Sequence, residues 1–252
     1  HFDPLDDYMD TILQQMMATV DGGLAREGVL PGDLKLKRIA KELKQKADTA
    51  KSAAEREKLL LCAYAYSASE ENASGSMTVT APTLGSSGIL PALVCYYPRI
   101  LGVSREQLRN GLKGAGLFGN LIKENATISG AQGGCQAEIG AAVAMGAAMV
   151  SYLRGQTMRQ IEYAAEIGIE HHLGLTCDPV GGYVMIPCIE RNAVGVLRAM
   201  DAAVLAEGIS DLREHKVSFD MVVNTMNYTG RKIPIELRET SLGGLARVVP
   251  LK

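Results

Sequence analysis

Hydrophobic and polar positions follow helical periodicity along most of the chain, and segments with the alternation of a β-strand are scarce. Residues 6–23 begin with acidic residues and end in a glycine pair, as expected at the two ends of a helix. The pattern over 34–48 predicts a basic amphipathic helix, whose charged side we interpret as solvent-exposed rather than as a nucleic-acid or membrane surface. A longer and more buried helix is predicted over 53–73.

The helical pattern is interrupted over residues 74–91, which are rich in Gly, Ser, Thr and Pro and predict a loop. Two capping boxes then mark helix starts. Ser104 begins a helix that is predicted to run to about residue 120, and Thr157 begins one that runs to about residue 171. Further helices are predicted over 189–205 and 218–229.

The segment 136–153 consists almost entirely of Ala, Gly, Ile, Val and Met. Small side chains on most faces suit a central helix that several neighbours approach closely, so we predict that this helix is the hub of a helical bundle. The fold class predicted is mainly α, with one domain over 1–252 in which Gly-rich loops form a site. Residues 1–21 are a candidate peripheral helix of that domain.

Composition excludes several classes of partner. The net charge of −2 provides no basic stripe for nucleic acid, and no apolar run is long enough to cross a membrane. Five cysteines without a disulfide-scaffold spacing indicate a reducing compartment, for which the cytoplasm is the default. His1 is not an initiator methionine, so we expect a processed chain, an engineered one or a part of a longer polypeptide.

Three of the cysteines, Cys135, Cys177 and Cys188, lie in loops marked by glycine or proline beside predicted helices. Three thiolates would give a metal three ligands and leave one position open, where a substrate can bind to a Lewis acid. Their spacing matches no compact zinc or ferredoxin pattern, so from the residues alone a metal site and inert buried thiols remain equally open. Cys62 and Cys95 lie in apolar segments with a helical pattern and are predicted to be buried thiols that bind no metal.

Other residues are candidates for acid, base or binding roles. Of the adjacent His171 and His172, only one can point toward a common site, because neighbouring helical residues differ by about 100°. The segment from Thr80 to Gly88 can hold a carboxylate or form a plain capping turn, and it lacks the glycine spacing of a nucleotide loop. Ionisable residues in apolar or loop contexts complete the set: Lys123, Glu138, Glu166, Glu170 and Asp178.

Four long motifs carry a resemblance to a known family. EENASGSMTVTAPTLGSSGILPAL, NATISGAQGGCQAEIG, EHHLGLTCDPVGG and PCIERNA, in this order, resemble the iron–sulfur-dependent bacterial L-serine dehydratases, specifically their alpha (catalytic) domain or subunit. The resemblance runs from about Gly22 to Ala246. It implies a lyase that works without pyridoxal phosphate and converts L-serine to pyruvate and ammonia.

The resemblance also implies a cofactor and site residues. Cys135, Cys177 and Cys188 would hold a 4Fe-4S cluster with one open iron, while a base takes the α proton of the substrate. We expect the catalytic groups among His171, Asp178 and Lys123. Hydrogen bonds to the amino-acid substrate are expected from residues of two loops: Thr80, Thr83, Ser86, Ser87, Gly88, Asn125 and Ser129.

Two departures from the family pattern bear on the expected partners. Family members also carry a small α/β domain or a beta subunit with a Ser-Ser-Ser-His-Thr motif, which this chain lacks, so the catalytic base can lie on a beta subunit or an N-terminal α/β domain. The chain ends VVPLK, without the terminal cysteine that caps the open iron in single-chain relatives, so self-capping is not predicted. A homo-oligomer is also expected.

Three other functions remain open from the sequence. A relative that acts on L-cysteine or L-threonine would use the same open iron with a different leaving group. A non-catalytic iron–sulfur or zinc module would use the cysteines to hold its fold with a partner. A helical domain without a cluster would leave the thiols inert.

Overall fold

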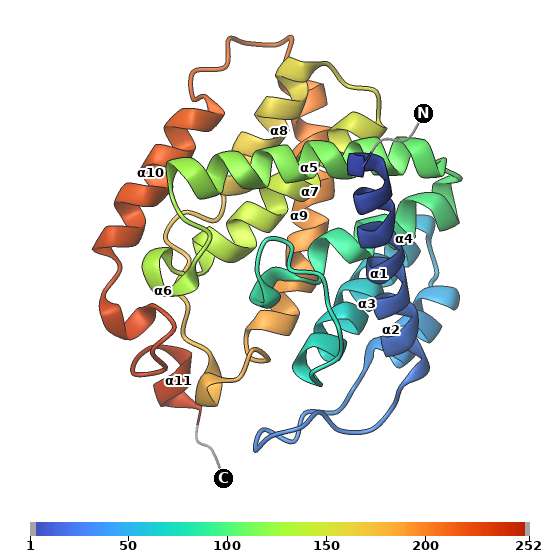
Figure 1. Cartoon of the computed structure of the whole chain (residues 1–252), viewed down its shortest axis with the longest axis vertical. Helices are drawn as coiled ribbons and strands as arrows, with labels where there is room; N and C mark the ends of the chain where they lie inside the picture. Colours follow the sequence, from blue (N-terminus) through green and yellow to red (C-terminus); the bar gives the residue numbers. More distant parts are fainter. Residues whose placement is uncertain (1–3, 250–252) are drawn as a thin grey trace.

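Helix α7 (Ala141–Leu153) lies at the centre of the computed structural model, which describes residues 4–249 (Figure 1). Every residue of α7 from Ala141 to Ser151 is buried. Neighbours pack on several of its sides: α4 (Ile89–Leu101), α5 (Arg105–Asn125), α8 (Met158–Glu170) and α9 (Cys188–Ile209). This confirms the prediction of an Ala/Gly-rich hub.

Small residues let the helices around α7 approach it closely. A Cβ on Gly168 of α8 would lie 2.9 Å from the Cα and N of Ala144, so the two backbones are in direct contact at this point. A Cβ on Gly146 would lie 3.1 Å from the Cβ of Ala199 on α9. The small residues of α7 therefore hold the bundle together through close packing of the helix backbones rather than through large side chains.

The N-terminal part of the chain forms a second group of helices beside this hub (Figure 1). It contains α1 (Pro4–Ala25), α2 (Ala40–Asp48) and α3 (Ala53–Ala73), and α3 packs against α1, α2, α4 and α9. Their apolar faces share one hydrophobic core with α4, α7 and α9. On the opposite side of the hub, α10 (Phe219–Lys232) packs against α8 and closes a second core with α5 and α7.

Both predicted capping boxes are present. The Ser104 hydroxyl accepts from the backbone N–H of Gln107 at the start of α5, and Thr157 accepts from that of Gln160 at the start of α8. In turn, the side-chain oxygen of each glutamine accepts a hydrogen bond from the backbone N–H of its capping residue. These local hydrogen bonds are encoded within four residues, so they are readable without the tertiary structure.

Two sequence predictions need correction. The helix expected over 34–48 begins only at Ala40, because Lys35 has a positive φ of 50° and Val29 and Lys37 pair in an isolated antiparallel bridge. The buried carboxylate of Glu70 holds the turn into the helix by accepting from the backbone N–H of Ile39 at 2.7 Å. The loop expected over 74–91 ends early, because α4 begins at Ile89.

Short turns connect the long helices. They are η1 (Leu84–Ser86), α6 (Gly130–Gly133), the π-helical turn η2 (Gln136–Gly140), η3 (Val180–Gly182), η4 (Ile235–Leu237) and α11 (Leu245–Val248). In the described part of the chain, the only β pairing consists of the Val29–Lys37 bridge and a parallel bridge between Cys177 and Arg238. The mainly α fold class is thus confirmed.

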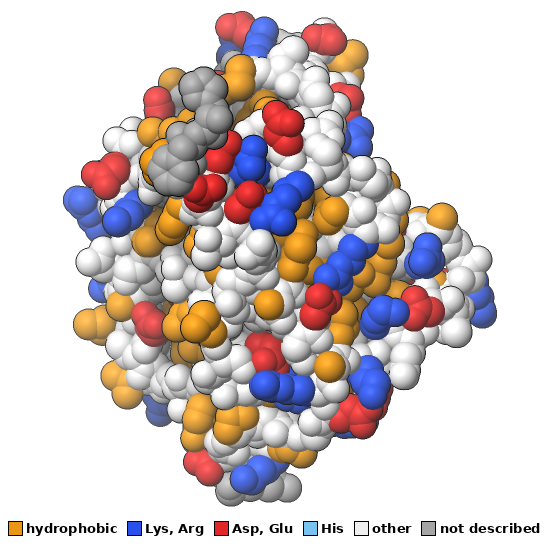
Figure 2. All heavy atoms as spheres, turned by 45° about the vertical axis from the view of Figure 1, so that its right-hand side comes forward, with side chains coloured by type: hydrophobic (Ala, Val, Ile, Leu, Met, Phe, Trp, Pro, Cys, Tyr) orange, Lys and Arg blue, Asp and Glu red, His pale blue; other side chains and the backbone are white. Residues whose placement is uncertain are grey.

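The surface is mixed in charge. On the face shown in Figure 2, Lys and Arg side chains lie close to Asp and Glu side chains, with hydrophobic side chains between them. No helix within residues 4–249 combines the length and apolar character that a membrane crossing requires. The sequence predictions that concern residues 1–3 and the terminal Pro250–Lys252 lie outside the described residues.

Candidate metal centre

Cys135, Glu138 and Cys177 converge in the interior of the molecule. Their two Sγ atoms and a carboxylate oxygen all lie within 4.8 Å of one another, and all three residues are buried. Cys135 and Glu138 come from the segment before α7, whereas Cys177 comes from the loop between α8 and α9. Soft thiolate sulfur together with a carboxylate is a donor set that binds a metal ion.

Main-chain hydrogen bonds hold the three segments of this site together. The N–H of Gln136 donates to the carbonyl of Leu175 at 3.1 Å, and the N–H of Cys177 donates to that of Leu237 at 2.8 Å. Gly134, with φ of 74°, gives the turn that leads into Cys135. The π-helical turn η2 then places Glu138 on the same side as Cys135. Such π turns are frequent at functional sites.

Two glycines line the space around the donors. A Cβ on Gly130 would lie 3.1 Å from Sγ of Cys177 and would overlap the carboxylate of Glu138. A Cβ on Gly85 would lie 2.8 Å from Oε2 of Glu138. Any larger residue would therefore fill the space beside the donors, which is the fit expected around a bound group.

Cys188, the first residue of α9, is also buried and interacts with this group. Burial and the nearby Cys135 raise the pKa of the Cys188 thiol to about 12. The thiols of Cys135 and Cys177 interact with each other, and this interaction lowers the pKa of Cys135 and raises the pKa of Cys177.

Arg191 supplies positive charge beside these thiols. It lies one turn after Cys188 on α9, and its charge lowers the pKa of Cys135. Its Nη1 donates to the carbonyl of Thr176 at 2.7 Å, which anchors the loop that carries Cys177. The sequence analysis did not select Arg191, although its position three residues after Cys188 in PCIERNA was a usable signal.

Glu138 links the thiols to the loop over 74–88. Oε2 accepts a hydrogen bond from Oγ1 of Thr83 at 2.5 Å, and Oε1 accepts one from Sγ of Cys177 at 3.6 Å. Burial raises the pKa of this carboxyl group. Glu138 was one of several candidate acids in the sequence, and the tertiary structure places it at the thiols.

Comparisons with known proteins identify the family of this chain. The family model described as serine dehydratase alpha chain matches residues 3–246. The chain belongs to the serine dehydratase alpha chain family. It is similar to the L-serine dehydratase of Streptomyces coelicolor, with 45% identity over 93% of this chain and 51% of that protein.

Other relatives of this serine dehydratase alpha chain give the same result. L-serine dehydratase 1 of Escherichia coli is 42% identical, over 96% of this chain and 54% of that protein. The L-serine dehydratase of Helicobacter pylori is 41% identical, over 97% of this chain and 54% of that protein. The chain therefore spans about half the length of the curated relatives that it matches, and the resemblance to the family is confirmed.

The predicted substrate loop of the alpha chain divides into two parts. Thr83 lies next to Glu138, and its hydroxyl oxygen is 3.1 Å from that of Ser86, which also hydrogen-bonds with the Thr83 backbone. Ser87 and Gly88 instead have internal partners, since the Ser87 hydroxyl donates to Leu84 and the Gly88 N–H donates to the side chain of Asn192. Thr80 is exposed and lines a cavity of about 460 Å³ between α1 and α5.

The second predicted loop is divided in the same way. Ser129 precedes α6, directly before Gly130 of the thiol site. Lys123 and Asn125 belong to α5, which is longer than the sequence predicts, and both are exposed. Lys123 lines the same cavity as Thr80, and the amide of Asn125 donates to the carbonyl of Leu121.

The predicted acid–base residues have other surroundings. His171 caps α8, is exposed and interacts with Ile167 and Glu170; among the described residues, no contact joins it to the thiols. His172 is half-buried beside Gly140 of η2. Asp178 is buried, and its two oxygens accept from the Thr176 hydroxyl at 3.0 Å and from the N–H of Leu245 at 2.7 Å.

Proposed function

We propose that this chain is the catalytic alpha portion of an L-serine dehydratase, in which Cys135, Cys177 and Cys188 hold a 4Fe-4S cluster with one open iron. The observation that supports this most is the convergence of the buried, unbridged thiols of Cys135 and Cys177 with Glu138, beside Gly130. The names of the relatives support the substrate and the reaction, which converts L-serine to pyruvate and ammonia.

The bound cluster would supply a Lewis acid that makes the substrate hydroxyl a better leaving group. Arg191 would balance part of the negative charge of the three thiolates, as it already does for Cys135. Glu138 would orient the Thr83 hydroxyl, which it already accepts from. Burial of these groups excludes water and strengthens each of their electrostatic interactions.

Substrate recognition is proposed for residues of the two predicted loops. We favour the hydroxyls of Thr83, Ser86 and Ser129, because Thr83 contacts Glu138, Ser86 contacts Thr83, and Ser129 directly precedes Gly130. Ser87 and Gly88 are proposed to shape the loop, since their hydrogen-bonding groups have internal partners. Thr80, Lys123 and Asn125 are proposed to line the approach on the side of α5.

The base that takes the α proton is proposed to come from another polypeptide segment. Both oxygens of Asp178 have partners within the chain, and His171 is exposed beside Glu170. A beta subunit or an N-terminal α/β domain is therefore the proposed source. The length of the relatives, about twice the matched span, supports such a partner. A homo-oligomer in the cytoplasm is also proposed, as five free thiols suit a reducing compartment.

Anaerobic reconstitution with iron and sulfide tests this function. Visible absorption is recorded with and without L-serine, and pyruvate is measured in the same sample. A brown protein whose spectrum responds to L-serine supports the proposal, and pyruvate release shows that this chain suffices. A colourless protein contradicts the cluster. A brown protein that responds to L-cysteine or L-threonine but not to L-serine contradicts the substrate.

A further inference from the structure

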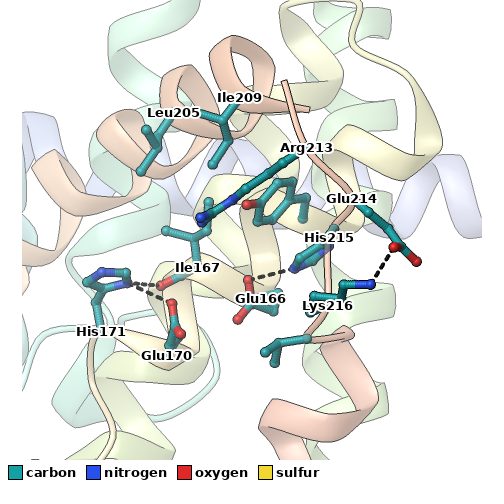
Figure 3. A pocket seen from close by; sticks show the side chains of 12 residues that line it. Glu166, Ile167, Glu170, His171, Leu205, Ile209, Arg213, Glu214, His215 and Lys216 are labelled. Carbon is teal, nitrogen blue, oxygen red and sulfur yellow. Dashed lines mark hydrogen bonds and ion pairs between the residues drawn. The ribbon is translucent and has the colours of Figure 1, made fainter. Parts of the chain in front are cut away.

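A cavity of about 620 Å³ lies between α8, the C-terminal end of α9 and the segment over 210–217 (Figure 3). Its lining contains none of the cysteines and neither Glu138 nor Arg191. The volume falls in the range of small-molecule sites, which is about 300 to 1,000 Å³. This cavity is therefore separate from the candidate metal centre.

Glu166 of α8 lines this cavity, and one of its oxygens lacks a partner. The residue is 2% exposed. Its Oε2 interacts with Nε2 of His215 at 3.2 Å, whereas the buried Oε1 has no hydrogen bond (Figure 3). A buried carboxylate oxygen without a donor costs about 1–3 kcal/mol, so a ligand that donates a hydrogen bond here would recover that cost.

The charge around Glu166 favours a cation. Burial, followed by the charges of Glu170 and Glu162 on the same helix, raises the pKa of Glu166 to about 8. In the lining of the cavity, Glu166, Glu170 and Glu214 stand against Arg213 and Lys216, and Lys216 is already paired with Glu214 (Figure 3). A positive ligand beside Glu166 would relieve the repulsion among these carboxylates.

The other walls of the cavity are apolar. Ile167, Leu205, Ile209 and Val217 line it, and the ring of His215 stacks on that of Tyr163 with centroids 3.6 Å apart. Such walls suit a hydrocarbon body. A metal ion suits them less well, and among residues 4–249 the group of potential metal ligands is Cys135, Glu138 and Cys177, none of which lines this cavity.

We propose that this cavity binds a small aliphatic amine as its ammonium ion, with the N–H groups donating to Oε1 of Glu166 and the hydrocarbon chain lying on Ile167, Leu205 and Ile209. The site does not depend on the proposed lyase activity. It also needs no iron, because all of the residues involved lie outside the thiol group.

Calorimetric titration of the whole chain with butylammonium tests the site. At about pH 9 the amine is still charged and Glu166 is largely ionised. Tetramethylammonium has the same charge but no N–H donor, and butan-1-ol has the same chain but no charge. We expect saturable binding of butylammonium that is about tenfold or more tighter than that of either comparison compound.

Variants locate the binding. Glu166→Gln should weaken butylammonium about tenfold or more, while Glu124→Gln, on an exposed part of α5 without a described partner, should leave it unchanged. Leu205→Trp provides a second test if Glu166→Gln does not fold, because Leu205 lines the cavity, is 47% exposed, and the larger ring would occupy part of the cavity volume. Absence of saturable binding to the wild-type chain, or binding that is unchanged in both cavity variants, would overturn the proposal.

Discussion

The carboxylate of Glu138 contacts the thiol of Cys177, with Oε1 and Sγ 3.6 Å apart in the buried interior. The same carboxylate accepts from Thr83, so one side chain joins the loop before α4 to the loop before α9. Glu138 therefore links the thiol of Cys177 to the candidate substrate loop through hydrogen bonds.

Replacement of Glu138 tests this connection. Glu138→Ala removes the acceptor of both Thr83 and Cys177, and we expect the free energy of unfolding to fall by about 1 to 3 kcal/mol. Glu138→Gln retains an acceptor oxygen and should lose less. Urea unfolding followed by circular dichroism measures both. Equal stability of Glu138→Ala and the wild type would show that these contacts contribute nothing.

The three cysteines of the proposed cluster should differ from the other two in iron binding. Cys135→Ser, Cys177→Ser and Cys188→Ser are each expected to abolish the visible absorption after anaerobic reconstitution, because each removes one of three thiolate ligands. Cys62→Ser is the matched control, since Cys62 is half-buried and contacts the carbonyl of Ala193 instead. Full colour in the Cys188 variant would remove that residue from the proposed ligand set.

The contact between α7 and α8 predicts opposite effects for two glycine substitutions. Gly168→Ala should lower the free energy of unfolding by about 1 to 3 kcal/mol, because the new Cβ meets the backbone of Ala144, which cannot move cheaply. Gly114→Ala, on α5 with open space around the added Cβ, should raise it by about 0.4 to 1 kcal/mol. Thermal unfolding at neutral pH measures the two changes, and destabilisation by both would refute the packing argument.

Glu166 predicts a pH dependence of stability. Its pKa is about 8 in the folded chain and 4.5 ordinarily, so between these values the folded state binds more protons than the unfolded state. The free energy of unfolding should therefore fall as the pH rises from about 4.5 to about 8. The charged groups that act on Glu166 are Glu170 and Glu162 on α8, and its Oε2 also contacts Nε2 of His215 on the segment over 210–217, near which Arg213 and Arg159 lie.

Unfolding curves between these two pH values test the contribution of Glu166. Glu166→Gln cannot ionise, so its stability relative to the wild type should rise with pH across this window. Glu124→Gln should follow the wild type, because it removes an exposed carboxylate without a described partner. Parallel curves for wild type and Glu166→Gln would show that Glu166 is already ionised at low pH.

Much of the fold was predictable because its signals are local. The capping boxes at Ser104 and Thr157 act within four residues, and the small side chains of α7 indicate close packing wherever the helix lies. The helical pattern around Cys95 is predicted without bounds, since α4 is apolar on nearly all sides and contains Pro98, which conceals its periodicity. The unwound segment before α2 depends on Glu70, thirty-one residues from Ile39, which no local pattern can reveal.

The sequence by itself determined which thiols lie close to glycine or proline, because these residue types impose backbone freedom or rigidity wherever they occur. Only the tertiary structure decided which side chains meet them. Glu138 and Arg191 reach the thiols because a π turn and the first turn of α9 direct them there. Asp178 is adjacent to Cys177 in sequence, but its carboxylate accepts hydrogen bonds from Thr176 and Leu245 instead. Proximity along the chain fixes distance but not direction, and direction is set by the packing of helices far apart in sequence.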